Sequence, residues 1–137
     1  MAMTVAVVAG CGSTGGKSAA LLRPSSPVNL SVYISNSRVS VSPAAVGAGP
    51  VAFVVTNQST QSESLAIGAG SGTLASTAPI NPQGTTQVTV DVKPGTYTIA
   101  TAPHGTDAQQ SHPSAIAGAT IHVGRQRPSS SNQVLQP

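Results

Sequence analysis

The chain has 137 residues, which is enough for one domain with extended ends. Only 7% of the residues are charged, and the six Lys and Arg residues behind the formal net charge of +3 are scattered along the sequence. The chain also has no Trp, one Phe and two Tyr. It therefore lacks the clustered cations and stacking aromatics of a nucleic-acid-binding protein, and that class is excluded. A single cysteine excludes an internal disulfide bond.

The amino-terminal residues 1–10 are small and apolar and lead directly into Cys11. Residues 8–11, with the sequence VAGC, resemble a bacterial lipobox, in which an aliphatic residue and two small residues precede a cysteine. The resemblance implies that residues 1–10 are the remainder of a signal peptide and that Cys11 is lipidated. Two acyl chains are sufficient for stable anchoring, so the expected location is extracytoplasmic, at the cell membrane. No Lys or Arg precedes Cys11, which departs from the pattern; a terminus with a chance cysteine is the alternative.

Residues 11–27 are rich in Gly, Ser and Pro and are predicted to form a flexible tether. A flexible segment of this length spans about 20–25 Å, enough to hold a domain clear of lipid headgroups. Gly16, Lys17 and Ser18 resemble the end of a phosphate-binding P-loop. Cys11 stands where that motif needs its first glycine, and the following residues are too few for its helix, so a nucleotide site is excluded.

Seven strands are predicted after the tether, because short apolar runs alternate there with turn residues. In one of them, Val88, Val90 and Val92 share one face and the polar residues between them share the other. The pattern predicts an all-β fold, a two-sheet Greek-key sandwich of about seven strands over residues 28–124. Residues 125–137 show no periodicity and are predicted to be a disordered tail. The predicted strands are residues 28–34, 38–42, 51–57, 64–67, 86–92, 96–101 and 119–123.

Three segments of the predicted domain resemble, in order and spacing, conserved parts of the cupredoxin family. They are residues 51–57 (VAFVVTN), 94–101 (PGTYTIAT) and 116–123 (IAGATIHV). The first resembles the strand ahead of the first copper-ligand loop, and the second resembles the strand that leads into the remaining ligands. The third resembles the last ligand turn and the closing strand. The resemblance covers residues 28–124 and implies a cupredoxin-like sandwich.

The residues that hold copper in that family are mostly absent. A type 1 copper site uses two His and one Cys in a plane, with a weak axial Met. The family pattern places the first His at Glu63 or Ser64, the Cys at Thr101, the second His at His104 and the Met at Ile116. Only His104 matches, and a threonine hydroxyl cannot replace the thiolate that dominates the bonding to copper. The resemblance therefore implies a domain without type 1 copper, and we expect no cofactor.

The histidines allow a different kind of metal site. His104 and His112 lie in one predicted loop, and Glu63 is expected at the same end of the sandwich. These three groups are of the types that bind Zn²⁺ or Cu²⁺, although two solvent-exposed loop histidines are the simpler interpretation. His122 alternates with apolar neighbours and is predicted to face outward.

The sequence contains no recognisable catalytic set. No G-x-S-x-G turn places a nucleophile, and nothing in the sequence brings two of the three carboxylates together. We therefore expect a protein that is not an enzyme. The leading hypothesis is a membrane-anchored module that binds or scaffolds an envelope protein partner. The alternatives are Cu or Zn handling through His104, His112 and Glu63, and an enzyme that uses the remodelled ligand pocket.

Overall fold

Eight β-strands and no helix make up the part of the chain that the computed structural model describes, residues 25–102 and 116–128. The described residues therefore contain no helix able to cross a membrane. The all-β prediction is confirmed, with eight strands where about seven were expected. The strands are β1 (Val28–Ile34), β2 (Val39–Ser42), β3 (Ala45–Asn57), β4 (Ser64–Ala69), β5 (Gly72–Ser76), β6 (Thr85–Val92), β7 (Gly95–Ala102) and β8 (Ala119–Gln126).

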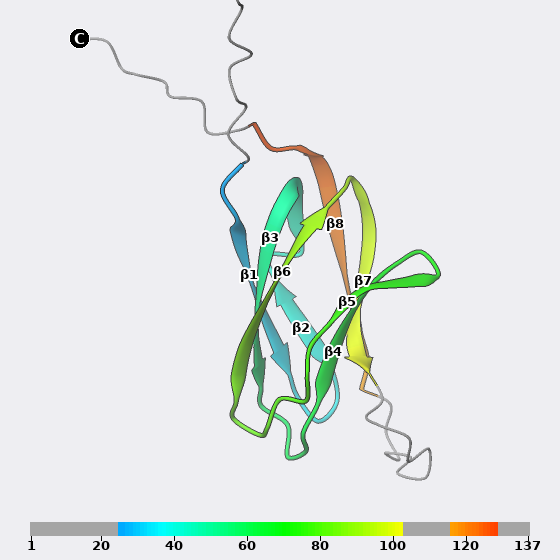
Figure 1. Cartoon of the computed structure of the whole chain (residues 1–137). Coiled ribbons are helices and arrows are strands. Elements are labelled where there is room, and N and C mark those ends of the chain that lie inside the picture. The colour runs from blue at the N-terminus through cyan, green and yellow to red at the C-terminus, as the bar shows by residue number, and fades with distance from the viewer. Residues whose placement is uncertain (1–24, 103–115, 129–137) are drawn as a thin grey trace, which may run out of the picture.

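The strands form two layers that share one long strand, β3 (Figure 1). One layer has the order β2-β1-β3-β6, and the other has the order β3-β8-β7-β4-β5. The first residues of β3, from Ala45 to Ala48, pair with β8, and the residues from Gly49 onward pair with β6. The change of partner coincides with Gly49, whose φ of 121° is unfavourable for other residues. The chain thus crosses between layers, as in a Greek-key sandwich.

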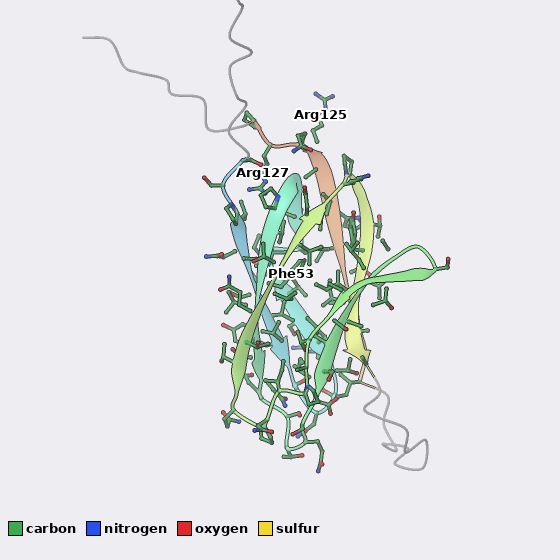
Figure 2. The ribbon with its side chains drawn as sticks, in the orientation of Figure 1. Phe53, Arg125 and Arg127 are labelled. Atoms are coloured by element: carbon green, nitrogen blue, oxygen red, sulfur yellow. The ribbon has the colours of Figure 1, made fainter. Side chains whose placement is uncertain are left out.

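The core lies between the layers and follows from the alternation of apolar residues along the strands. In β1, Leu30, Val32 and Ile34 are fully buried while the residues between them are exposed. Phe53 of β3 is the largest fully buried side chain and lies at the centre of the sandwich (Figure 2). The opposite layer contributes fully buried aliphatic side chains from β4, β7 and β8, namely Leu65, Ile67, Ile99 and Ile121.

The largest differences from the sequence-based prediction are in two strands, while β4 and β8 extend a few residues beyond their predicted ends. The strand β5 was not predicted, because Gly72–Ser76 is short and largely exposed and has no apolar alternation. The strand β3 begins at Ala45, well before the predicted residue 51. Its first residues, AVGAGP, contain two glycines and a proline, which favour loops in a sequence-based reading. Here the glycines are required by close packing, since a Cβ at Gly47 would lie 2.5 Å from the Arg127 side chain.

Arg127 joins both described ends of the chain to β3, in an arrangement that we call the terminal clasp (Arg127 with Ser26, Gly47, Ala48 and Pro50). The Arg127 Nη1 donates a hydrogen bond to the Ser26 carbonyl at 2.7 Å. Its Nε donates to the carbonyls of Gly47 and Ala48 at 3.2 and 3.3 Å, and its Nη2 donates to that of Pro50. The backbone N–H of Arg127 donates to the Ala48 carbonyl at 3.0 Å.

The clasp corrects the predicted domain boundaries. The disordered tail was predicted to start at residue 125, but Arg125 and Gln126 belong to β8 and Arg127 is hydrogen-bonded. The predicted tether ended at residue 27, but Ser25 is already buried. Both errors have one cause. The carbonyls that Arg127 binds come from β3, about 80 residues away in sequence, and no local pattern indicates such a contact.

Candidate functional site

At the end of the sandwich opposite the terminal clasp, β4 begins and β7 ends (Figure 1). The described residues that the sequence resemblance assigns to ligand positions lie on or next to these strands. We call this end the distal pole; it comprises Glu63 and Ser64, Thr101 and Ala102, and Ile116 to Gly118. The strands β4 and β7 place the first two pairs together, because Ser64 pairs with Ala102 and Leu65 pairs with Thr101. The described residues of the distal pole thus come from strands that are distant in sequence and paired in the sheet.

The segment that begins at Ile116, after the undescribed residues 103–115, is fixed against the same pole. The Ala117 N–H donates to the Ser37 carbonyl at 3.0 Å, and the Val39 N–H donates to the Ala117 carbonyl at 2.7 Å. Gly118 packs so closely against β7 that an added Cβ would lie 3.2 Å from the Ala100 Cβ. Ile116, which the sequence resemblance assigns to the axial position, is half-buried beside these contacts.

Glu63 is held in place by its backbone and by burial. Its N–H donates to the Ile80 carbonyl at 3.1 Å, and the Ile80 N–H donates to the Glu63 carbonyl at 2.8 Å. The residue is only 4% exposed. A carboxylate ligand at this position is therefore tied to the interior of the pole and does not reach outward from a surface loop.

Asn57 organises the loop between β3 and β4. Its side-chain Nδ2 donates to the Gln61 carbonyl at 2.7 Å and to the Ile80 carbonyl at 2.8 Å. Its Oδ1 accepts a hydrogen bond from the Ser59 N–H at 2.9 Å. The side chain is fully buried, and these bonds give both of its N–H donors and its oxygen a partner inside the protein. The sequence resemblance placed Asn57 at the end of the strand, and its role as the centre of the loop became visible only in the structure.

The comparisons with known proteins give matches in structure alone. The sequence matches no family model and no curated protein. Auracyanin A of Chloroflexus aurantiacus, described as a blue copper protein, superposes with a TM-score of 0.50 and 14% identity, covering 72% of this chain and 100% of that one. Auracyanin B superposes with a TM-score of 0.51 and 16% identity over 73% of this chain and 89% of its own. Rusticyanin of Thiobacillus ferrooxidans gives 0.50 and 16%, over 71% and 77%.

The fold is cupredoxin-like. At these identities the likeness concerns the backbone arrangement and does not extend to the copper chemistry. It agrees with the fold that the three sequence segments implied, including the position of residues 94–101 in β7.

The distal pole does not fit type 1 copper, because the donor atoms are of the wrong kind. Blue-copper sites depend on a cysteine thiolate with two histidines. Thr101, beside Leu65 of β4, offers a hydroxyl, and Ile116 offers no donor atom. The only cysteine of the chain is Cys11, far from this position in sequence. A cupredoxin-like backbone is thus combined with side chains that cannot form the blue-copper bonding.

The alternative metal ligands divide between described and undescribed parts of the chain. His104 and His112 lie outside the described residues, so their pairing with Glu63 stays a prediction. Within residues 25–102 and 116–128, no group of three His, Cys, Asp or Glu side chains could hold a metal ion. His122 is exposed on β8, with its Nδ1 3.5 Å from the Thr96 Oγ1, and its predicted outward orientation is confirmed.

Proposed function

We propose that this protein is an extracytoplasmic lipoprotein, anchored to the cell membrane through Cys11, whose cupredoxin-like domain binds or scaffolds an envelope protein partner. One observation carries the proposal: the sandwich is retained while the copper position at Thr101 offers only a hydroxyl. Without the thiolate the domain has no blue-copper centre for electron transfer.

The orientation of the sandwich relative to the proposed anchor supports this role. The described chain begins at Ser25, beside the terminal clasp, and the distal pole lies at the other end of the sandwich (Figure 1). An anchor at Cys11 therefore directs the clasp toward the membrane and the distal pole away from it. Loops at the free end of a rigid sandwich are the usual place for recognition of a partner, so the distal pole is the surface that we assign to the partner.

The first prediction concerns the anchor. We expect labelled fatty acid to be incorporated into the wild-type protein in its native host and to be absent from the Cys11→Ser variant, with the variant released from the membrane fraction. Mass spectrometry of the mature protein should give a first residue of Cys11 carrying acyl chains. The Ser13→Ala variant, two residues away, should behave as the wild type does. Unmodified Cys11 in membrane-free protein would contradict the anchor, and repeated envelope pull-downs without a reproducible partner would contradict the binding role.

The second prediction concerns copper. Adding Cu(II) to the purified protein should produce no intense blue absorption, because no thiolate stands at position 101. Calorimetric titration with Cu(II), Cu(I) and Zn²⁺ should give the same weak or absent binding for the wild type and for His104→Ala. Tight binding that is lost in His104→Ala would instead support metal handling by His104, His112 and Glu63. That second function is favoured by one observation, the burial of Glu63 at the pole where β7 ends at Ala102.

A further inference from the structure

The strand β6 is an open edge of the sandwich. Among the described strands it pairs only with β3, in an unbroken antiparallel register from Gly49 opposite Val92 to Thr56 opposite Thr85. In such a pair, alternate residues direct their backbone N–H and C=O groups away from the partner strand. An eight-residue strand whose outward groups pair with no other described strand is a template for the addition of another strand.

The other described edges are protected against this kind of pairing. The strand β2 has four residues and is followed at once by Pro43, which has no N–H to donate. The strand β5 has five residues, and its pairing with β4 is interrupted by a register shift at Ile67 and Gly68. In contrast, β6 has no proline, no register shift and one charged residue, Asp91. Short edges, prolines and bulges are the common ways to block edge pairing, and β6 has none of them.

The inner face of β6 is also incompletely covered. Thr86, Val88 and Val90 point toward the core but are only half-buried. The residues that they face on β3, including Phe53 and Val55, are fully buried. The half-exposed valines therefore lie at the margin of the core, where a strand added beyond β6 would cover them.

The sequence of β6 is complementary to itself. When two copies pair antiparallel about Val88, Thr86 faces Val90 on the inner side and Gln87 faces Thr89 on the outer side. When they pair about Thr89, Val88 faces Val90 and Gln87 faces Asp91. Valine and threonine side chains meet on the inner face. On the outer face Asp91 lies opposite the uncharged Gln87 or Thr85, so in neither register do the two Asp91 carboxylates meet.

The geometry points to a homodimer in which β6 pairs with β6 of a second copy of this chain. The two layers of order β2-β1-β3-β6 then form one continuous sheet through the dimer axis. A two-fold axis needs a self-complementary surface of this kind. Because one strand from each copy buries less area than a standard interface of about 1,600 Å², the dimer dissociates on dilution. The inference does not depend on the anchor at Cys11.

The test is sedimentation equilibrium of the full-length, unlipidated chain carrying Cys11→Ser, which excludes dimers linked through the cysteine. From micromolar to millimolar concentration, we expect a reversible monomer–dimer equilibrium. The double variant Gln87→Glu, Thr89→Glu changes two exposed residues of β6. It places like charges opposite each other in both registers, residue 87 against residue 89 or against Asp91. Its dissociation constant should rise at least about tenfold, since each 1.4 kcal/mol of repulsion is worth a factor of ten.

The matched control is Thr96→Glu, Thr98→Glu, which has the same spacing and the same added charge on β7. Those residues are exposed, but β7 is flanked by β4 and β8 and offers no free edge. The control should dimerise as the parent does, with circular dichroism showing that all variants are folded. A parent that stays monomeric at millimolar concentration would overturn the proposal. So would equal dimerisation of the β6 variant, or equal loss of the dimer in the control.

Discussion

Replacing Arg127 by alanine should lower the free energy of unfolding by about 2–3 kcal/mol. The guanidinium donates hydrogen bonds to four carbonyls, of which those of Ser26, Ala48 and Pro50 span the start of the described chain and the middle of β3. Its removal leaves several of these carbonyls without their charged donor. Water can reach part of the site, because Arg127 is only half-buried, and this limits the loss.

Urea denaturation followed by circular dichroism measures the effect. The control is Arg125→Ala, which removes the same charge from an exposed residue that projects away from the sandwich in Figure 2. We expect its stability to lie within about 0.5 kcal/mol of the wild type. Arg127→Lys should recover part of the loss at most. An ammonium group lacks the planar guanidinium whose several N–H groups reach four carbonyls at once. Equal stabilities of the Arg125 and Arg127 variants would contradict the clasp.

The largest effect at the distal pole is expected from Asn57→Ala, which should cost about 3–4 kcal/mol. The substitution removes the bonds from Nδ2 to the carbonyls of Gln61 and Ile80 and the bond from the Ser59 N–H to Oδ1. The Asn57 side chain is fully buried. Its partners therefore lose their hydrogen bonds at a place where water cannot easily take the position of the amide. The exposed neighbour Gln58 provides the control Gln58→Ala, for which little change is expected.

The Asn57 variant can be resolved further by amide hydrogen exchange. Faster exchange should be confined first to the Ser59 N–H and to the neighbouring amides of Glu63 and Ile80, which pair with each other beside the Asn57 network. The amides of β1 and β8 should remain the more protected. Uniform loss of protection across both layers would show that Asn57 stabilises the whole sandwich and not the distal pole in particular.

The alternation of apolar residues was sufficient to predict most of the fold. In β1, Leu30, Val32 and Ile34 alternate with polar residues and are buried as the pattern predicts. The same pattern failed for the first part of β3, where Gly47 and Gly49 are needed to admit the Arg127 side chain. A close approach between segments distant in sequence imposes no local period, and so it could not be predicted from the sequence.

The candidate site was also only partly predictable, because its surroundings depend on contacts between segments that are distant in sequence. Order and spacing assigned Glu63 or Ser64 and Thr101 to ligand positions of the cupredoxin pattern, and in the structure Leu65, the next residue after Ser64, pairs with Thr101. Burial depends on the three-dimensional neighbours, and for that reason the enclosure of Glu63 and the network around Asn57 were not foreseen. The sequence resemblance indicated which residues stand at the ligand positions, and the structure showed how deeply they are buried and what they are hydrogen-bonded to.

The nearness of the two described ends has a consequence for how this domain can be engineered. Because Arg127 binds the carbonyl of Ser26, the polypeptide enters and leaves the sandwich at the same place. A unit built in this way can be inserted into a loop of a host protein, or its ends can be joined by a short linker and new ends opened elsewhere, with little change to its interior. The domain is thus suited to being grafted as a cassette.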